Sequence, residues 1–174
     1  MKLEEYQALA LRTARMFPTD IENLNHAALG LASEFFEVCA ADGPDQQKEE
    51  IGDCAWYMAL ACHALNANFH DLFQSPLLDF DVETPIAALK DFISEVKGLV
   101  VYNRTLDDER RQDMLEDLEK FAYTLRCFEV DSDTPIVDVL EQNIAKLRKR
   151  FPDAYSHELA DARIDKGGVD SRNS

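Results

Sequence analysis

The sequence predicts an all-α protein, folded as an antiparallel helical bundle in one compact domain. Apolar residues recur three and four positions apart along most of the chain, which is the spacing of one helical face. No stretch alternates strictly between apolar and polar residues, as a half-buried strand would. Short segments rich in Gly, Pro, Asp and Asn separate the periodic stretches, which fits the brief connections between antiparallel helices.

The first half of the chain predicts three helices and one shorter helical segment. Pro18 and Asp20 end the first helix. In the turn at residues 42–45, Gly43 and Pro44 together signal the end of one helix and the start of the next. We expect helices over residues 2–16, 23–41 and 46–65, followed by one or two helical turns over residues 69–73.

Two Thr-Pro pairs mark predicted helix starts in the second half. Thr84 and Thr134 each stand as a cap before a proline at the first helical position. We expect helices over residues 84–102, 107–128, 135–150 and 155–163. The folded domain then spans residues 1–164, and residues 165–174 form a flexible tail.

The chain is strongly acidic, with 34 Asp and Glu against 18 Lys and Arg and a formal net charge of −16. Such a charge repels nucleic acid polymers and anionic lipid. Apolar runs are far shorter than the ~20 residues that cross a bilayer, and the N-terminus is acidic rather than a signal peptide. The four cysteines form no CxxC pair, which predicts reduced, buried thiols. We expect a cytoplasmic protein without a membrane or polymeric nucleic acid partner.

Two pairs of acidic residues indicate a metal site. Glu34 and Glu37 lie three residues apart, as do Glu50 and Asp53, so each pair shares one helical face. Two such helices facing each other bring four carboxylates together, and these repel one another unless a cation lies between them. Similar pairs occur on ordinary solvated helices, but large apolar residues flank both of these. Oxygen-only ligands favour Mg²⁺ or Mn²⁺.

Three stretches together resemble the MazG-like, all-α nucleoside triphosphate pyrophosphohydrolase superfamily. They are Leu29–Val38 with the first acidic pair, Glu49–Tyr57 with the second, and Asn143–Pro152. The middle of the chain, about residues 67–135, departs from the short members of that family. The resemblance implies a Mg²⁺-dependent hydrolase that cleaves (d)NTPs to (d)NMP and pyrophosphate in nucleotide-pool house-cleaning. It also implies a homodimer or homotetramer.

The resemblance assigns a role to each candidate residue. It makes Glu34, Glu37, Glu50 and Asp53 the metal ligands and the catalytic residues. It makes the following residues candidates for substrate binding: Lys146 and Arg150 for phosphate, Asn143 for phosphate or sugar, Tyr57 and Trp56 for base or sugar, and His26 and Arg163. Simpler readings stay open for several of these. One of the adjacent residues Trp56 and Tyr57 can instead belong to the core. Lys146 and Arg150 can complement the dipole at the end of their helix. His26 can be a partly buried structural residue.

An internal near-repeat offers a reason for the long middle segment. Residues 33–38 can be aligned with residues 94–99, and residues 49–56 with residues 116–123. In the second copy Gly98 stands where Glu37 stood and Lys120 where Asp53 stood. Helical periodicity alone also produces such matches. If residues 84–163 are a degenerate half-repeat, the chain has one metal cluster, and it lies in the first half.

Two alternatives to the pyrophosphohydrolase remain. One is a non-catalytic helical protein that kept the fold and dimerises as a regulatory partner. The other is a metal-dependent phosphohydrolase of the HD type. That chemistry needs paired His and Asp ligands, and the His70-Asp71 dipeptide has no supporting set of histidines.

Overall fold

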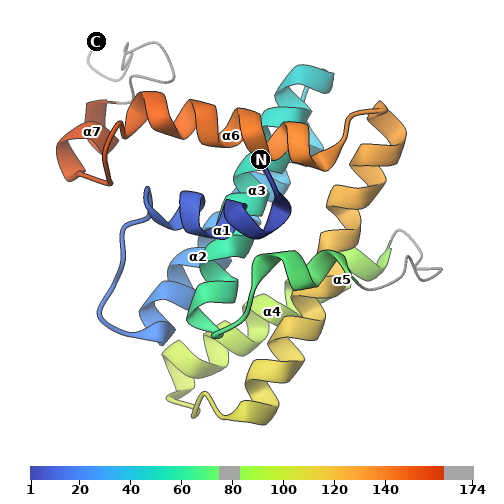
Figure 1. Ribbon diagram of the computed structural model, residues 1–174. Helices are drawn as coiled ribbons and strands as arrows, with labels where there is room; N and C mark the ends of the chain where they lie inside the picture. The colour runs from blue at the N-terminus through green and yellow to red at the C-terminus, as the bar shows by residue number, and fades with distance from the viewer. Residues whose placement is uncertain (75–82, 163–174) are drawn as a thin grey trace, which may run out of the picture.

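The computed structural model describes residues 1–74 and 83–162 (Figure 1). Its regular structure in these ranges is helical throughout, which confirms the predicted all-α class. The elements are α1 (Leu3–Leu11), α2 (Asp20–Ala40), α3 (Pro44–Ala64), the 3₁₀ helix η1 (Phe69–Phe73), α4 (Glu83–Tyr102), α5 (Asp108–Ser132), α6 (Ile136–Arg150) and α7 (His157–Ala162). The predicted tail, residues 165–174, lies outside the described ranges.

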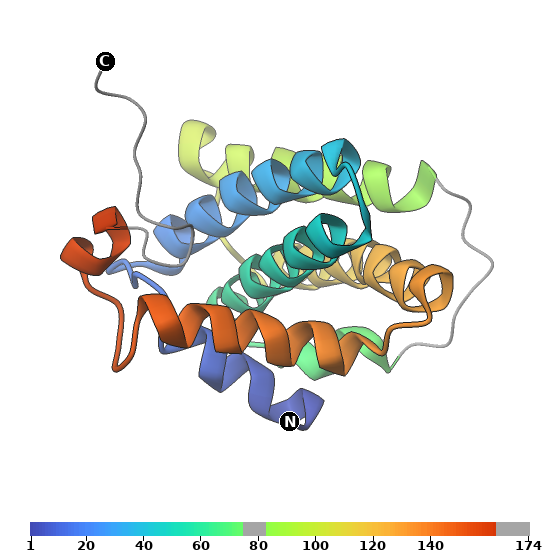
Figure 2. The same cartoon turned by 90° about the horizontal axis from the view of Figure 1, so that it is seen from above.

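Helix α3 lies at the centre of the molecule (Figure 2). Helices α2 and α4 form a layer on one side of it, α5 lies beside it, and α6 and α1 cover the opposite side. Eleven residues of α3 are buried: Glu50, Ile51, Gly52, Cys54, Ala55, Met58, Ala59, Leu60, Ala61, Cys62 and Ala64. Glu50, the charged residue among them, therefore lies between packed helices, where an unpaired charge is costly.

Several helix boundaries differ from the predicted ones. Helix α1 ends at Leu11 rather than at residue 16, because the Thr13 hydroxyl donates to the Ala10 carbonyl oxygen at 2.8 Å and turns the chain. Helix α2 begins at Asp20, earlier than predicted, since Thr19 and Glu22 form a capping box. The Thr-Pro pairs do not supply N-caps: Thr84 lies inside α4, and Pro135 itself caps α6.

The cysteines also differ in part from expectation. Cys54 and Cys62 are buried, as predicted, whereas Cys39 is exposed and Cys127 is half-buried. All four are free thiols. Among the described residues, no helix is both long enough and apolar enough to span a membrane.

Candidate metal centre and adjoining pocket

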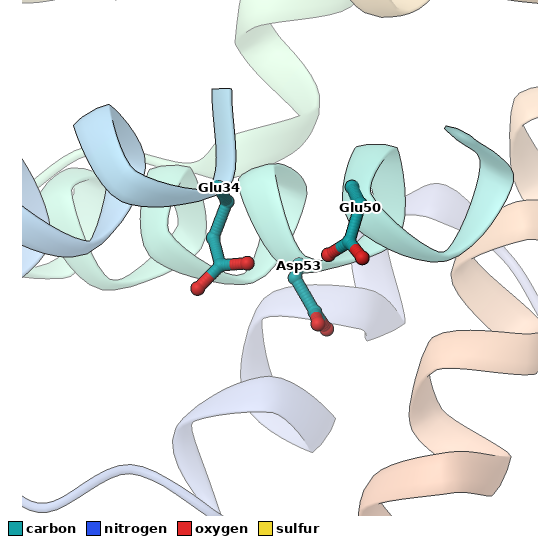
Figure 3. Close-up of side chains that lie close together, drawn as sticks. All are labelled: Glu34, Glu50 and Asp53. Atoms are coloured by element: carbon teal, nitrogen blue, oxygen red, sulfur yellow. The ribbon is translucent and has the colours of Figure 1, made fainter. Parts of the chain in front are cut away.

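Three carboxylates meet where α2 faces α3 (Figure 3). Glu34 comes from α2, and Glu50 and Asp53 come from consecutive turns of α3. One oxygen from each lies within 4.8 Å of the others. Glu50 is only 5% exposed, so these charges are brought together in a partly desolvated place. Oxygen atoms at this spacing fit a hard divalent cation, which would offset their mutual repulsion.

Glu37, the fourth predicted ligand, does not belong to this group. It is exposed on α2, one helical turn beyond Glu34. The sequence pattern places both residues on one face, but the crossing of α2 and α3 brings only the first of them against the second acidic pair. The structure thus assembles three of the four predicted carboxylates.

A buried hydrogen-bond network fixes the orientation of Asp53. Asn143 from α6 is 4% exposed and donates from Nδ2 to Asp53 Oδ1 at 2.7 Å. The Tyr6 hydroxyl from α1 donates to Asn143 Oδ1 at 3.0 Å. A Cβ atom added to Gly52 would lie 3.0 Å from the Cβ of Asn143, so glycine allows α6 to approach α3 this closely. Asn143, predicted to bind substrate, therefore positions a candidate metal ligand.

Lys146 neutralises the same carboxylate. Its ammonium nitrogen lies 2.6 and 2.5 Å from the two Asp53 oxygens and 3.2 Å from Glu49 Oε1. Burial alone would lower the pKa of Lys146, but the charges of Asp53 and Glu49 and the hydrogen bonds to them raise it. Lys146 is therefore a cation at neutral pH and lies beside the three-carboxylate group.

A pocket of about 430 Å³ adjoins the carboxylates. Glu34 and Asp53 line one part of it. Three basic side chains also line it, Lys146 and Arg150 from α6 and Arg15 from the connection between α1 and α2. In a chain with a net charge of −16, this concentration of basic groups beside a candidate cation site suits a ligand that carries both phosphate and bound metal.

Aromatic rings form another wall of the pocket, which Phe17, His26, Trp56 and Tyr57 line. The rings of Trp56 and Tyr57 meet edge to face at 4.8 Å between centroids, and His26 lies 5.6 Å from Tyr57. The Trp56 indole N–H donates to Thr13 Oγ1 at 3.0 Å and to the Ala10 carbonyl oxygen at 3.1 Å. Both adjacent aromatic residues therefore reach the pocket, although Trp56 also anchors the turn after α1.

Tyr57 fits against a glycine of α2. A Cβ atom added to Gly30 would overlap the Tyr57 ring. Burial, followed by the charges of Glu34 and Asp53, raises the pKa of Tyr57 to about 12, so the phenol stays neutral and can donate a hydrogen bond.

We expect Gly30→Ala to destabilise the protein by up to about 2 kcal/mol. Alanine favours a helix interior by about 1 kcal/mol over glycine. Displacing a packed ring costs typically 1–3 kcal/mol and here exceeds that gain. Thermal denaturation measures the difference. Gly98→Ala in α4 is the matched control, because only the flexible Arg104 side chain lies near its added Cβ. Equal melting temperatures for the two variants would show that Gly30 makes no room for Tyr57.

Arg150, another predicted site residue, is the last residue of α6. Arg150 Nη2 donates to the Ala160 carbonyl oxygen at 2.8 Å, and its guanidinium lies 5.2 Å from the Phe151 ring centroid. Arg150 thus holds α7 against the pocket as well as lining it. Arg163, the remaining candidate for substrate binding, lies outside the described residues.

Sequence reasoning missed the residues that the α1–α2 connection contributes. Thr13, Arg15 and Phe17 line the pocket, although residues 12–16 were predicted to be helical. The available signal was Pro18, because the residue before a proline is biased away from the helical conformation.

In the second helix pair, the two acids that align with Glu34 and Glu50 are Glu95 and Asp117, and both form ion pairs. Glu95 lies 3.0 Å from Arg110 Nε and 3.7 Å from Arg104 Nη1. Asp117 pairs with Lys120 at 3.7 Å. Within the described ranges, the group Glu34, Glu50 and Asp53 is the one set of potential metal ligands that converges.

No protein-family model matches the chain, and no curated protein or solved structure matches it either.

Proposed function

We propose that this protein is a Mg²⁺-dependent nucleoside triphosphate pyrophosphohydrolase, with the fold and chemistry of the MazG-like enzymes that its sequence resembles. One observation carries the proposal: two members of the three-carboxylate group, Glu34 and Asp53, line the same pocket as two basic residues of α6 and a wall of aromatic rings. Metal ligands, phosphate-binding cations and a base-stacking surface are the three parts that this reaction needs.

Each part of the site has a distinct role in the proposed reaction. Glu34, Glu50 and Asp53 would hold Mg²⁺, which when bound neutralises phosphoryl oxygens and lowers the pKa of a water molecule. Lys146 donates to a phosphate oxygen, and Asn143 keeps Asp53 in place. The elements of water add across the bond between the α- and β-phosphates. The products are a nucleoside monophosphate and pyrophosphate.

A panel of NTPs and dNTPs tests this function through pyrophosphate release with Mg²⁺, with Mn²⁺ and with EDTA. We expect metal-dependent release from at least one nucleotide and none in EDTA. Monophosphate and pyrophosphate should form in equal amounts. Release of inorganic phosphate instead, or no release from any nucleotide, would refute the proposal and favour the non-catalytic alternative.

We further infer that the chain is a tandem arrangement in which α4 and α5 repeat α2 and α3. Each pair is joined by a short connection, and Phe35 of the first pair contacts Phe121 of the second at 5.4 Å between centroids. The neutralised acids at Glu95 and Asp117 support the loss of metal ligands from the second copy. One metal ion cluster per chain follows, which equilibrium dialysis with Mn²⁺ can count.

We also propose self-association through the α2–α4 layer. Six of the seven exposed large apolar side chains in the described ranges belong to these two helices: Leu29, Phe36, Ile86, Val100, Val101 and Tyr102. Covering them with a second copy would remove them from water. The double substitution Leu29→Ser and Phe36→Ser should therefore lower the mass measured by light scattering to that of one chain. A monomeric wild-type protein would contradict this prediction.

A further inference from the structure

Arg15 lines the pocket without a hydrogen-bond or ion-pair partner in the described chain. Its guanidinium lies over the Phe17 ring at 4.7 Å from the centroid. Neither a hydrogen bond nor an ion pair is made by this side chain within the described residues, whereas Lys146 in the same pocket is paired with Asp53. Stacking on Phe17 pre-orients the flat, five-donor guanidinium while leaving its donors available.

A series of rings connects Arg15 to the carboxylates. Phe17 lies 5.6 Å from His26, and His26 lies 5.6 Å from Tyr57, each in edge-to-face contact. Tyr57 in turn lies close enough to Glu34 and Asp53 for their charges to raise its pKa. A nucleotide whose phosphates lie at the metal group would therefore place its base along these rings, with the outer edge of the base toward Arg15.

His26 marks the same part of the pocket as a ligand site. Its Nδ1 atom is buried and has no hydrogen-bond partner in the described part of the chain. Burial and then the charge of Arg15 lower the pKa of His26, so the ring is neutral at pH 7. A buried ring nitrogen without a partner costs free energy, which a polar ligand atom can offset.

We propose that Arg15 reads the base and that the pocket prefers guanine over adenine nucleotides. Guanine presents two adjacent acceptors, O6 and N7, which match two donors of one guanidinium. Adenine places an amino group where guanine has O6, so one donor would face another donor. The inference rests on the proposed function for the direction in which the nucleotide lies. It assigns a substrate class to that function.

A competing role for Arg15 is attraction of phosphate, which the conservative substitution separates from base recognition. Lysine at this position keeps the positive charge but loses the planar pair of donors. Arg15→Lys should therefore show a smaller preference between purines while keeping general anion attraction. Arg15→Met should lose both. Arg148→Gln is the charge control, because Arg148 is exposed on α6 and does not line the pocket.

Trp56 provides the measurement, because it is the one tryptophan in the chain and lines the pocket. GMP and AMP are titrated in EDTA against the wild type and the three variants, by Trp56 fluorescence and independently by calorimetry. We expect the wild type and Arg148→Gln to bind GMP about tenfold more tightly than AMP, the low end of the range for one bidentate base contact. Arg15→Met should bind the two nucleotides nearly equally, and Arg15→Lys should show a smaller preference than the wild type.

Three results would overturn the inference. These are equal affinities for GMP and AMP in the wild type, a preference of wild-type size retained in Arg15→Met, and no binding of either nucleotide by calorimetry. None of these measurements involves metal or turnover. Failure of every triphosphate to release pyrophosphate would refute the proposed enzyme, whereas hydrolysis without a purine preference would refute the role of Arg15 alone.

Discussion

Replacing Glu50 with Gln is expected to abolish Mn²⁺ binding and to lower pyrophosphate release by at least about 100-fold. Loss of an outer-shell partner already costs about 10–100-fold in metal sites, and Glu50 is a proposed direct ligand. Its carboxylate lies within 4.8 Å of Glu34 and Asp53, and the side chain is 5% exposed. Gln keeps the shape of the side chain but removes the negative charge that holds a divalent cation.

Thermal denaturation separates loss of metal binding from loss of the fold. A ligand at 100 times its Kd stabilises the native state by about 2.7 kcal/mol, which corresponds to a rise of roughly 5–10 °C for a domain of this size. The wild type should show this rise with Mn²⁺, and Glu50→Gln should not. Without metal, the variant should melt no lower than the wild type, because one of three mutually repelling charges has gone.

Glu37→Gln is the matched control for the same experiment. Glu37 has the same chemistry and lies on the same helix as Glu34, but it is exposed and outside the three-carboxylate group. We expect this variant to keep the Mn²⁺-induced stabilisation and most of the pyrophosphate release. If Glu37→Gln fails as completely as Glu50→Gln, the sequence-based set of four ligands is right and the three-carboxylate group is incomplete.

The sequence was sufficient to predict that the chain is helical and that Glu34 meets the second acidic pair, because both follow from helical periodicity and a short turn. A turn containing Gly43 and Pro44 makes α2 and α3 neighbours, and so Glu34 meets Glu50 and Asp53. Whether Glu37 joins the three-carboxylate group depends instead on the angle at which α2 and α3 cross. That angle follows from close approaches such as Gly30 against Tyr57, which periodicity does not encode.

The pocket was less predictable than the carboxylate group for a related reason. Thr13, Arg15 and Phe17 line it from the connection between α1 and α2. Apolar residues keep their helical spacing in this part of the sequence, although α1 has already ended at Leu11. The hydrogen bond from Thr13 to Ala10 that ends α1 is held by Trp56, more than forty residues away, whose indole N–H donates to the oxygen atoms of both residues. A tertiary contact thus overrides local propensity and turns Arg15 toward the site.

Replacing Lys146 with Met is expected to change metal and phosphate binding in opposite directions. In the described structure the Lys146 ammonium lies 2.5 and 2.6 Å from the Asp53 oxygens, so it competes with a metal ion for that carboxylate. Removing it should tighten Mn²⁺ binding about tenfold, since hydrogen bonds to charged groups contribute about 1.5–3 kcal/mol. The same change should weaken pyrophosphate binding and slow hydrolysis, because a phosphate-binding cation has gone.

The opposite effects on Mn²⁺ and pyrophosphate binding distinguish two roles of Lys146: competing with the metal ion for Asp53, or holding Asp53 in place for it. Calorimetry with Mn²⁺ in the presence and absence of pyrophosphate measures both effects, and Lys149→Met controls for the charge change at an exposed position on α6. In the wild type, pyrophosphate should tighten Mn²⁺ binding by drawing Lys146 from Asp53, and by linkage Mn²⁺ should tighten pyrophosphate binding equally. In Lys146→Met this part of the coupling should vanish. A variant that binds Mn²⁺ more weakly than the wild type would show instead that Lys146 holds Asp53 in place for the metal.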